Sequence, residues 1–149
     1  MGKVKRKNKI RRNLILRALL DNKALSLTDL KNKTGISLPV VSSIVSNLQK
    51  QGYLVEVKDK ENKKAGRPPS IYKLNGDAGY VLGVDIGRVN SNYVIIDLAQ
   101  NIVKSVRRKS VDVNTAEIET VDKLIEELNK VLKDTKVDWE QILGVGFSI

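Results

Sequence analysis

The sequence predicts an α+β protein in two parts, a helical first part that ends in a β-hairpin and a second part of strands and one helix. Apolar residues recur every three or four positions through most of the first 52 residues, whereas extended, β-branched runs dominate afterwards. The charge also changes, because residues 1–75 carry 18 Lys or Arg and 5 Asp or Glu, whereas residues 76–149 carry 9 and 12. We therefore expect a basic arm at residues 1–8, one domain at 9–75 and a second domain at 76–149.

The charge asymmetry indicates what kind of protein this is. The first part has a net charge of +13 and the second a net charge of −3. This distribution favours a nucleic-acid-binding module joined to a domain of another kind. A lysine-rich surface that serves only solubility is the alternative, and the asymmetry makes it the weaker one.

Composition excludes several classes of site. The chain has no Cys and no His, which excludes disulfides, thiolate or imidazole metal sites and a histidine general base. We therefore expect no metal and no cofactor within the chain. No apolar run approaches the ~20 residues needed to cross a bilayer, and no charged-then-apolar leader opens the sequence. We expect a soluble, cytoplasmic protein that is associated with the nucleoid and has no membrane contact.

The first helix is expected at residues 9–22. Its apolar stripe would consist of Ile10, Leu14, Ile15, Ala18 and Leu19. The charged segment before it has no period, so we expect a mobile basic arm there. Two alternatives stay open for this arm, contact with phosphates or simple solvation.

Two further helices are marked by their ends. Ser26 would begin one of them, with Asp29 three positions later as an acidic variant of the capping box, and Gly35 would end it as a left-handed cap. Ser37 would cap the next helix, with Pro39 in its first turn, and Gly52 would close it. Two helices with a glycine-marked turn between them predict a helix-turn-helix.

The last of these helices is the candidate DNA reader. With Val41, Ile44, Val45 and Leu48 facing the core, the outer face is polar, small and free of acids. Small hydroxyl side chains let a helix enter the major groove, where Asn47 can pair bidentately with adenine and Val40 can contact a thymine methyl. The candidate DNA-binding residues of this helix are Ser37, Pro39, Val40, Ser42, Ser43, Ser46, Asn47 and Lys50.

A basic hairpin follows the helix-turn-helix. Extended runs at 53–57 and 71–74 flank the loop 58–70, which holds five Lys or Arg and two Pro. A β-hairpin that directly follows a helix-turn-helix is called a wing. Within it Gly66-Arg67-Pro68 resembles the core of an AT-hook, in which arginine enters an A·T-rich minor groove. Lys63 and Lys64 are candidate phosphate contacts, although Gly and Pro also punctuate many ordinary loops. The expected partner is therefore a double-stranded, A/T-rich operator.

The second part has a different pattern. Strands are expected at 80–87, 93–98, 102–109 and 142–147, with a helix at 116–133. The first of these strands ends in Asp85-Ile86-Gly87, an Asp-x-Gly sequence. Both Asp85 and Gly87 are interpreted structurally, as a strand end and a tight turn.

These motifs together resemble one family. The β-β-β-α-β order with Leu-Gly-Val-Asp-Ile-Gly on its first strand is similar to the opening of the actin/hexokinase-type, ribonuclease H-like α/β fold. A winged helix, Gly66-Arg67-Pro68-Pro69 and Tyr72-Lys73-Leu74-Asn75 before that opening resemble the repressor side of the ROK family of transcriptional repressors and sugar kinases. The resemblance implies a repressor of sugar-utilisation genes that is relieved by a sugar or sugar phosphate. Such a repressor would act as a homodimer or higher oligomer on an inverted repeat.

The sequence also departs from the family. Kinases of the family follow Asp-x-Gly with Gly-Thr, whereas this chain has Arg88-Val89-Asn90. Asp85 and Gly87 are thus vestigial phosphate-loop positions, and we expect no cofactor binding, no catalytic residue and no enzyme activity. By the resemblance, the family's sugar-binding residues, catalytic aspartate and zinc site would lie beyond residue 149. We therefore expect a truncated ROK domain at 76–149, the first portion of a longer regulator.

Two other functions remain as alternatives. One is a ROK-type sugar kinase, which the altered phosphate loop disfavours. The other is a non-specific nucleic-acid-binding protein, for example an RNA binder. RNA-binding modules usually present aromatic side chains for base stacking, and the basic part has only Tyr53 and Tyr72, both at positions that suit a core.

Overall fold

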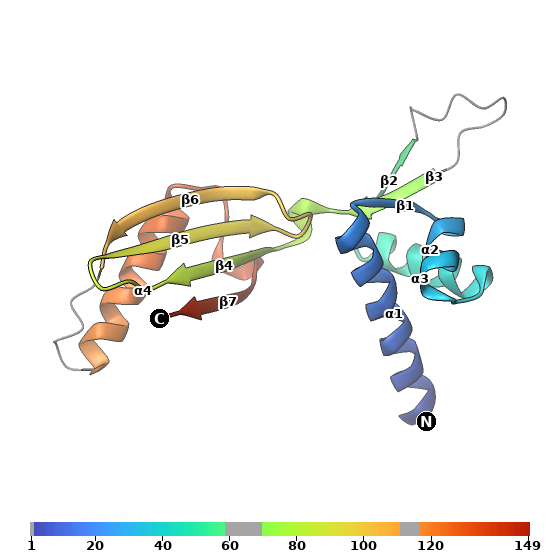
Figure 1. Cartoon of the computed structure of the whole chain (residues 1–149), viewed down its shortest axis with the longest axis horizontal. Coiled ribbons are helices and arrows are strands. Elements are labelled where there is room, and N and C mark those ends of the chain that lie inside the picture. Colours follow the sequence, from blue (N-terminus) through green and yellow to red (C-terminus); the bar gives the residue numbers. More distant parts are fainter. Residues whose placement is uncertain (1, 59–69, 111–116) are drawn as a thin grey trace. The chain divides into compact units, whose positions relative to one another are not determined.

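The structure is a computed structural model that describes residues 2–58, 70–110 and 117–149. Side chains are described from Arg6 onward in the first stretch and from Val121 onward in the last. The chain divides into two compact units, residues 1–75 and 76–149 (Figure 1). The break in charge falls at the same place.

Unit 1 is a three-helix bundle with a small antiparallel sheet. Its elements are α1 (Gly2–Asn22), β1 (Ala24–Ser26), α2 (Leu27–Thr34), α3 (Leu38–Lys50), β2 (Leu54–Lys58) and β3 (Ser70–Leu74). The sheet has the order β1-β3-β2. Its buried core is formed by Ile15, Leu19, Leu25, Leu30, Ile36, Val41, Val45, Leu48, Leu54, Tyr72 and Leu74.

Helix α1 is longer than the sequence predicts. It begins at Gly2, so the mobile arm expected at residues 1–8 is wrong for residues 2–8. Lys and Arg are good helix formers, and α1 contains no Gly or Pro after Gly2. The helix can therefore continue through the densely charged segment. Ile10 and Leu14 of the predicted stripe are about half exposed, because only the part of α1 around Ile15 and Leu19 packs on the bundle.

Strand β1 was not predicted from the sequence. Its three residues pair antiparallel with β3, with Leu25 opposite Tyr72. Lys23, just before it, has a φ of 62° and turns the chain out of α1. Three residues are too few to show the alternation by which a strand is recognised.

Unit 2 is a four-stranded sheet with one helix packed on it. Its elements are η1 (Gly76–Ala78), β4 (Tyr80–Asp85), β5 (Asn90–Asp97), β6 (Ile102–Lys109), α4 (Glu117–Lys133), η2 (Trp139–Gln141) and β7 (Ile142–Ser148). The strand order is β6-β5-β4-β7, antiparallel except for the parallel pair β4–β7. The core joins sheet to helix through Leu82, Val84, Tyr93, Ile95, Leu128, Val131, Leu132 and Val137. Apolar side chains of the edge strand β7 are exposed, namely Leu143, Val145 and Phe147.

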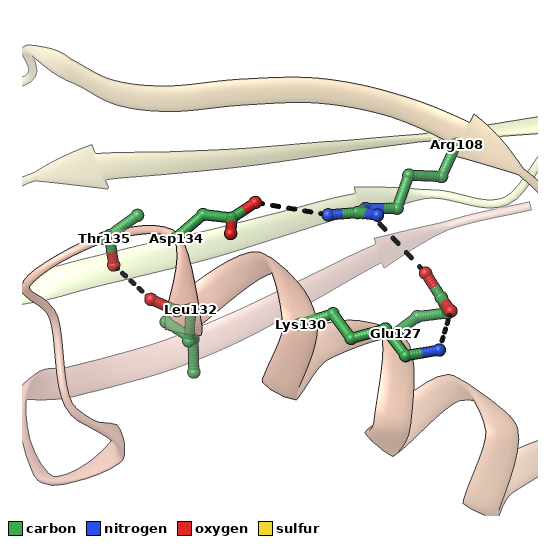
Figure 2. A network of polar contacts seen from close by, with 6 residues as sticks. All are labelled: Arg108, Glu127, Lys130, Leu132, Asp134 and Thr135. Atoms are coloured by element: carbon green, nitrogen blue, oxygen red, sulfur yellow. Dashed lines mark hydrogen bonds and ion pairs between the residues drawn. The ribbon is translucent and has the colours of Figure 1, made fainter.

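Polar contacts fix α4 to the sheet, as Figure 2 shows. Arg108 of β6 places Nη2 3.4 Å from Oδ2 of Asp134 and Nε 3.8 Å from Oε2 of Glu127. Glu127 also accepts a hydrogen bond of 2.7 Å from Nζ of Lys130. One arginine thus connects β6 with α4 and with the residue that follows its end.

Candidate nucleic-acid interface

The outer side of α3 carries the side chains that the sequence predicts for it. Val41, Val45 and Leu48 are buried and Ile44 is half-buried. The predicted contact residues are exposed, apart from the half-buried Val40: Ser37, Pro39, Ser42, Ser43, Ser46, Asn47 and Lys50. Their presentation to solvent on one helix is therefore a structural fact, while their contact with DNA stays a prediction.

Helix α2, which precedes the turn before α3, is capped at both of its ends. The Ser26 hydroxyl accepts a hydrogen bond of 3.1 Å from the Asp29 N–H, and the Asp29 carboxylate accepts one of 3.1 Å from the Ser26 N–H. This is the predicted capping box. Gly35 ends α2 with a φ of 68°, as predicted. The hydrogen bonds from the Ser26 side chain and then from its backbone hold the pKa of Asp29 below its usual value.

Ser37 occupies the N-cap of α3, but its side chain makes no capping hydrogen bond. The side-chain cap expected there is wrong. Pro39 takes the second position of the helix and has no N–H, which removes one of the two groups that an N-cap side chain can bond. The Ser37 carbonyl accepts the N–H groups of Val40 and Val41, each at 3.0 Å, and the side chain stays exposed.

The other end of α3 is anchored to the sheet. Tyr53 N–H donates to the Leu48 carbonyl at 3.0 Å and Gly52 N–H to that of Gln49 at 2.9 Å, with Gly52 at a φ of 80°. This pair of hydrogen bonds is a Schellman motif. Asn75 then donates its side-chain amide to the Gly52 carbonyl at 2.8 Å and its N–H to the Tyr53 carbonyl at 2.9 Å. The C-terminal end of α3 is thus held by hydrogen bonds to Asn75.

A groove of about 920 Å³ separates α1 from α3. Its lining from α1 is Asn8, Lys9, Arg11, Arg12, Asn13 and Leu16, and from α3 it is Pro39, Val40, Ser43, Ile44, Asn47 and Leu48. The groove adds cations to the polar surface of α3. None of these α1 residues was among the predicted contacts, because the sequence predicted no site on the first helix. The acid-free run from Gly2 to Leu20 was the signal that could have found them.

Arg12 of α1 contacts the segment that follows α3. Its guanidinium carbon lies 5.5 Å from the centroid of the Tyr53 ring. Tyr53 lies before β2 and is half-buried, whereas Tyr72 lies within β3 and is buried. The core position expected for Tyr72 is confirmed. Tyr53 is only half-buried, and its ring contacts the Arg12 guanidinium.

The predicted wing contacts lie outside the described residues. These are Lys63, Lys64, Gly66, Arg67 and Pro68. The described base of the hairpin pairs Lys58 with Ser70, and the Ser70 hydroxyl donates a hydrogen bond to the Glu56 carboxylate. The strands that carry the loop therefore belong to the same sheet that anchors α3.

The Asp-x-Gly sequence of unit 2 has the structural role expected for it. Asp85 ends β4 and accepts a hydrogen bond of 3.1 Å from the Asn92 amide. A Cβ on Gly87 would lie 2.3 Å from the Asn90 carbonyl oxygen, so this turn requires glycine. Strand β5 begins at Asn90, three residues earlier than predicted, because polar residues there pair with β6.

The described residues lack two kinds of feature. No group of three or more His, Cys, Asp or Glu side chains among them is arranged to hold a metal ion. None of the helices in this part of the chain has the length and apolar character needed to cross a membrane.

Comparison with known proteins identifies relatives of both units. Residues 14–65 match the model of the MarR family. A xylose repressor of Bacillus subtilis (strain 168) is 29% identical over 141 residues, which is 95% of this chain and 36% of that protein. A xylose repressor of Caldicellulosiruptor bescii is 28% identical over 142 residues, or 94% of this chain and 35% of that protein. The chain thus spans little more than a third of the length of the curated relatives it matches.

One solved structure has a similar fold. A ROK family transcriptional regulator, described as a homologue of the E. coli MLC protein, matches with a TM-score of 0.63 at 14% identity. The match covers 93% of this chain and 34% of that one. At this identity the likeness concerns the fold. The relatives are transcriptional repressors and regulators, consistent with a chain that is not an enzyme.

Proposed function

We propose that unit 1 binds a specific sequence in duplex DNA and that the protein represses transcription of sugar-utilisation genes. One observation carries the proposal: the solvent side of α3 is polar, small and acid-free, while its opposite side is buried and its C-terminal end is anchored. An exposed helix face of an ordinary bundle usually carries Glu and Lys for solubility. A face of serines and an asparagine instead suits entry into the major groove.

The side chains of α3 divide into two roles. Ser43 and Asn47, together in the groove-lining set, are placed to contact base edges, and Asn47 has the donor and acceptor that adenine requires. Lys50 at the end of the helix is a phosphate contact. Phosphate contacts fix register and base contacts provide sequence preference, so the two roles are separable by measurement.

The wing would add a minor-groove contact. Arg67 between Gly66 and Pro68 has the flat guanidinium that fits a narrow A·T-rich groove, and Lys63 and Lys64 would bind phosphates. An A/T-rich operator follows from this arrangement. Because one winged helix covers only a half-site, we propose a homodimer or higher oligomer on an inverted repeat.

Unit 2 would belong to a ROK domain that senses a sugar or sugar phosphate. The support is the fold likeness to a ROK regulator and the names of the xylose repressors. Its action in the complete protein would be to change the DNA affinity of unit 1. A regulator of this kind works in the cytoplasm, on the nucleoid.

Two other functions have less support. A sugar kinase would need the Gly-Thr that Arg88-Val89-Asn90 replaces, and Asp85 is engaged with Asn92. A non-specific nucleic-acid binder would need no defined base-reading face, yet the α3 surface is defined and anchored.

Selection from random duplexes with the full chain tests the proposal. The expected result is one enriched half-site motif, bound at least about 10³-fold more tightly than its shuffled sequence at physiological salt. Enrichment of no motif, with equal affinity for all duplexes, would favour the non-specific binder and contradict the proposal.

A further inference from the structure

The groove between α1 and α3 combines three kinds of surface. One wall carries the cations Lys9, Arg11 and Arg12 of α1. The other wall carries the polar side chains Ser43 and Asn47 of α3. Apolar atoms of Leu16, Ile44 and Leu48 form part of its lining.

We propose that this groove seats one sugar-phosphate strand of the DNA that α3 reads, so that α1 is a second DNA-binding helix. The inference rests on the proposed function of α3 and names the contacts that accompany it. Cations on one wall match phosphate oxygens, and hydroxyl and amide groups on the other wall match phosphates or base edges at the border of the major groove. The apolar lining suits the deoxyribose carbons between successive phosphates.

Two of the three groove cations, Lys9 and Arg11, are free to bind an anion. Within the described part of the chain, neither Lys9 nor Arg11 forms an ion pair, and α1 has no acid before Asp21. Arg6 and Lys7, also exposed, continue the positive charge toward the N-terminus. Unpaired cations gathered in a concave surface raise the local concentration of a polyanion.

The groove is also preformed. Helix α1 is continuous from Gly2 to Asn22, which a solvated arm would not be. Arg12 rests on the Tyr53 ring, next to the Schellman motif that ends α3. The Arg12–Tyr53 contact and the continuous helix therefore order the α1 wall before DNA arrives, which limits the conformational entropy lost on binding.

The test uses the full chain and three variants, Lys9→Gln, Arg11→Gln and the matched control Arg17→Gln. Gln keeps helix propensity and hydrogen bonding but removes the charge. Arg17 lies on the same helix, is exposed and does not line the groove. Affinities are measured on the selected duplex and its shuffled sequence between 50 and 200 mM salt, with thermal unfolding to verify that each variant is folded.

Lys9→Gln and Arg11→Gln should each reduce the salt slope by about 1 on both duplexes, as expected for one lost phosphate contact. The ratio of specific to shuffled affinity should stay unchanged, and Arg17→Gln should behave as the wild type. An unchanged slope for both groove variants, with the sequence preference intact, would overturn this inference and leave the proposed function standing. Absence of sequence preference in the wild type would instead contradict the proposed function.

One competition separates DNA from an acidic protein partner. Polyglutamate and a duplex of equal charge are compared as competitors for the labelled selected duplex. The duplex should compete far better, because only DNA places phosphates and deoxyribose in the spacing of the groove. Equal competition by polyglutamate would assign the groove to an acidic polypeptide and overturn the inference.

Discussion

The guanidinium carbon of Arg12 lies 5.5 Å from the centroid of the Tyr53 ring. This contact joins the basic part of α1 to a residue three positions after the end of α3. It is a cation–π interaction between α1, which lines the groove, and the segment that connects α3 to β2. The contact helps to hold a highly charged helix in place near the end of α3.

Tyr53→Leu should therefore weaken the packing of α1 on the rest of unit 1. Leu keeps apolar area but removes the ring, so the loss should be about 0.5–1 kcal/mol of the free energy of unfolding of unit 1. Tyr53→Phe is the matched control and should be close to neutral, because the ring face is retained. Urea unfolding followed by far-UV circular dichroism measures both. Equal losses in the two variants would show that the hydroxyl, not the ring, makes the contact.

The capping box of α2 should give a pH-dependent contribution. Ser26→Ala removes an N-cap side chain and should cost about 1 kcal/mol of unfolding free energy at pH 7. Because the pKa of Asp29 is lowered in the folded state, its contribution is present above the pKa of the unfolded chain and is lost as the pH falls through the folded pKa.

The cost of Ser26→Ala should accordingly shrink as the pH is lowered from 5 to below that folded pKa. Denaturant unfolding of the variant and the wild type at several pH values measures it, with Ser46→Ala on the exposed side of α3 as control. A cost that is constant over this range would contradict the ionised capping box.

How far the sequence could predict this fold depends on whether a signal is local. The ends of α2 and α3 were predictable because Ser26, Asp29, Gly35 and Gly52 determine them within a few residues. The start of β5 was not, because polar residues there are held in the sheet by their partners on β6, which overrides local propensity.

The candidate site likewise has one part that the sequence could predict and one part that it could not. The outer side of α3 follows from helical periodicity, so its exposed residues were predictable. The α1 wall of the groove depends on the packing of two helices and on the Arg12–Tyr53 contact, which no spacing along the chain contains. The dense charge of residues 2–8 predicted a mobile arm, whereas the structure continues the helix through them.

The proposed minor-groove contact of the wing predicts that affinity depends on the sequence that flanks the half-site. Arg67→Ala should weaken binding most to half-sites with A·T-rich flanks and little to those with G·C flanks, where the guanine amino group blocks the groove floor. Arg67→Lys should restore only part of the loss, because it keeps the charge but not the planar fork. Paired duplexes that differ only in their flanks measure this. An equal cost on both flanks would make the loop an electrostatic clamp.

Unit 2 should have no phosphoryl-transfer activity. The Asp85 carboxylate is bonded to Asn92, and the tight turn at Gly87 leads into Arg88-Val89-Asn90 instead of Gly-Thr. The full chain should therefore release no phosphate from ATP, with or without xylose or glucose, above the level of Asp85→Ala. A rate that falls to background in Asp85→Ala would contradict this expectation and revive the kinase alternative.

The most direct test of the account is the sequence preference of Asn47→Ala. Binding of the wild type and the variant is compared on the selected half-site and its shuffled sequence, at one salt concentration. A lost base contact is worth about 1–3 kcal/mol, so the affinity for the selected site should fall about 5- to 150-fold while that for the shuffled duplex hardly changes. Ser43→Ala should shift the preference in the same direction. An equal loss on both duplexes would contradict the claim that α3 reads DNA bases.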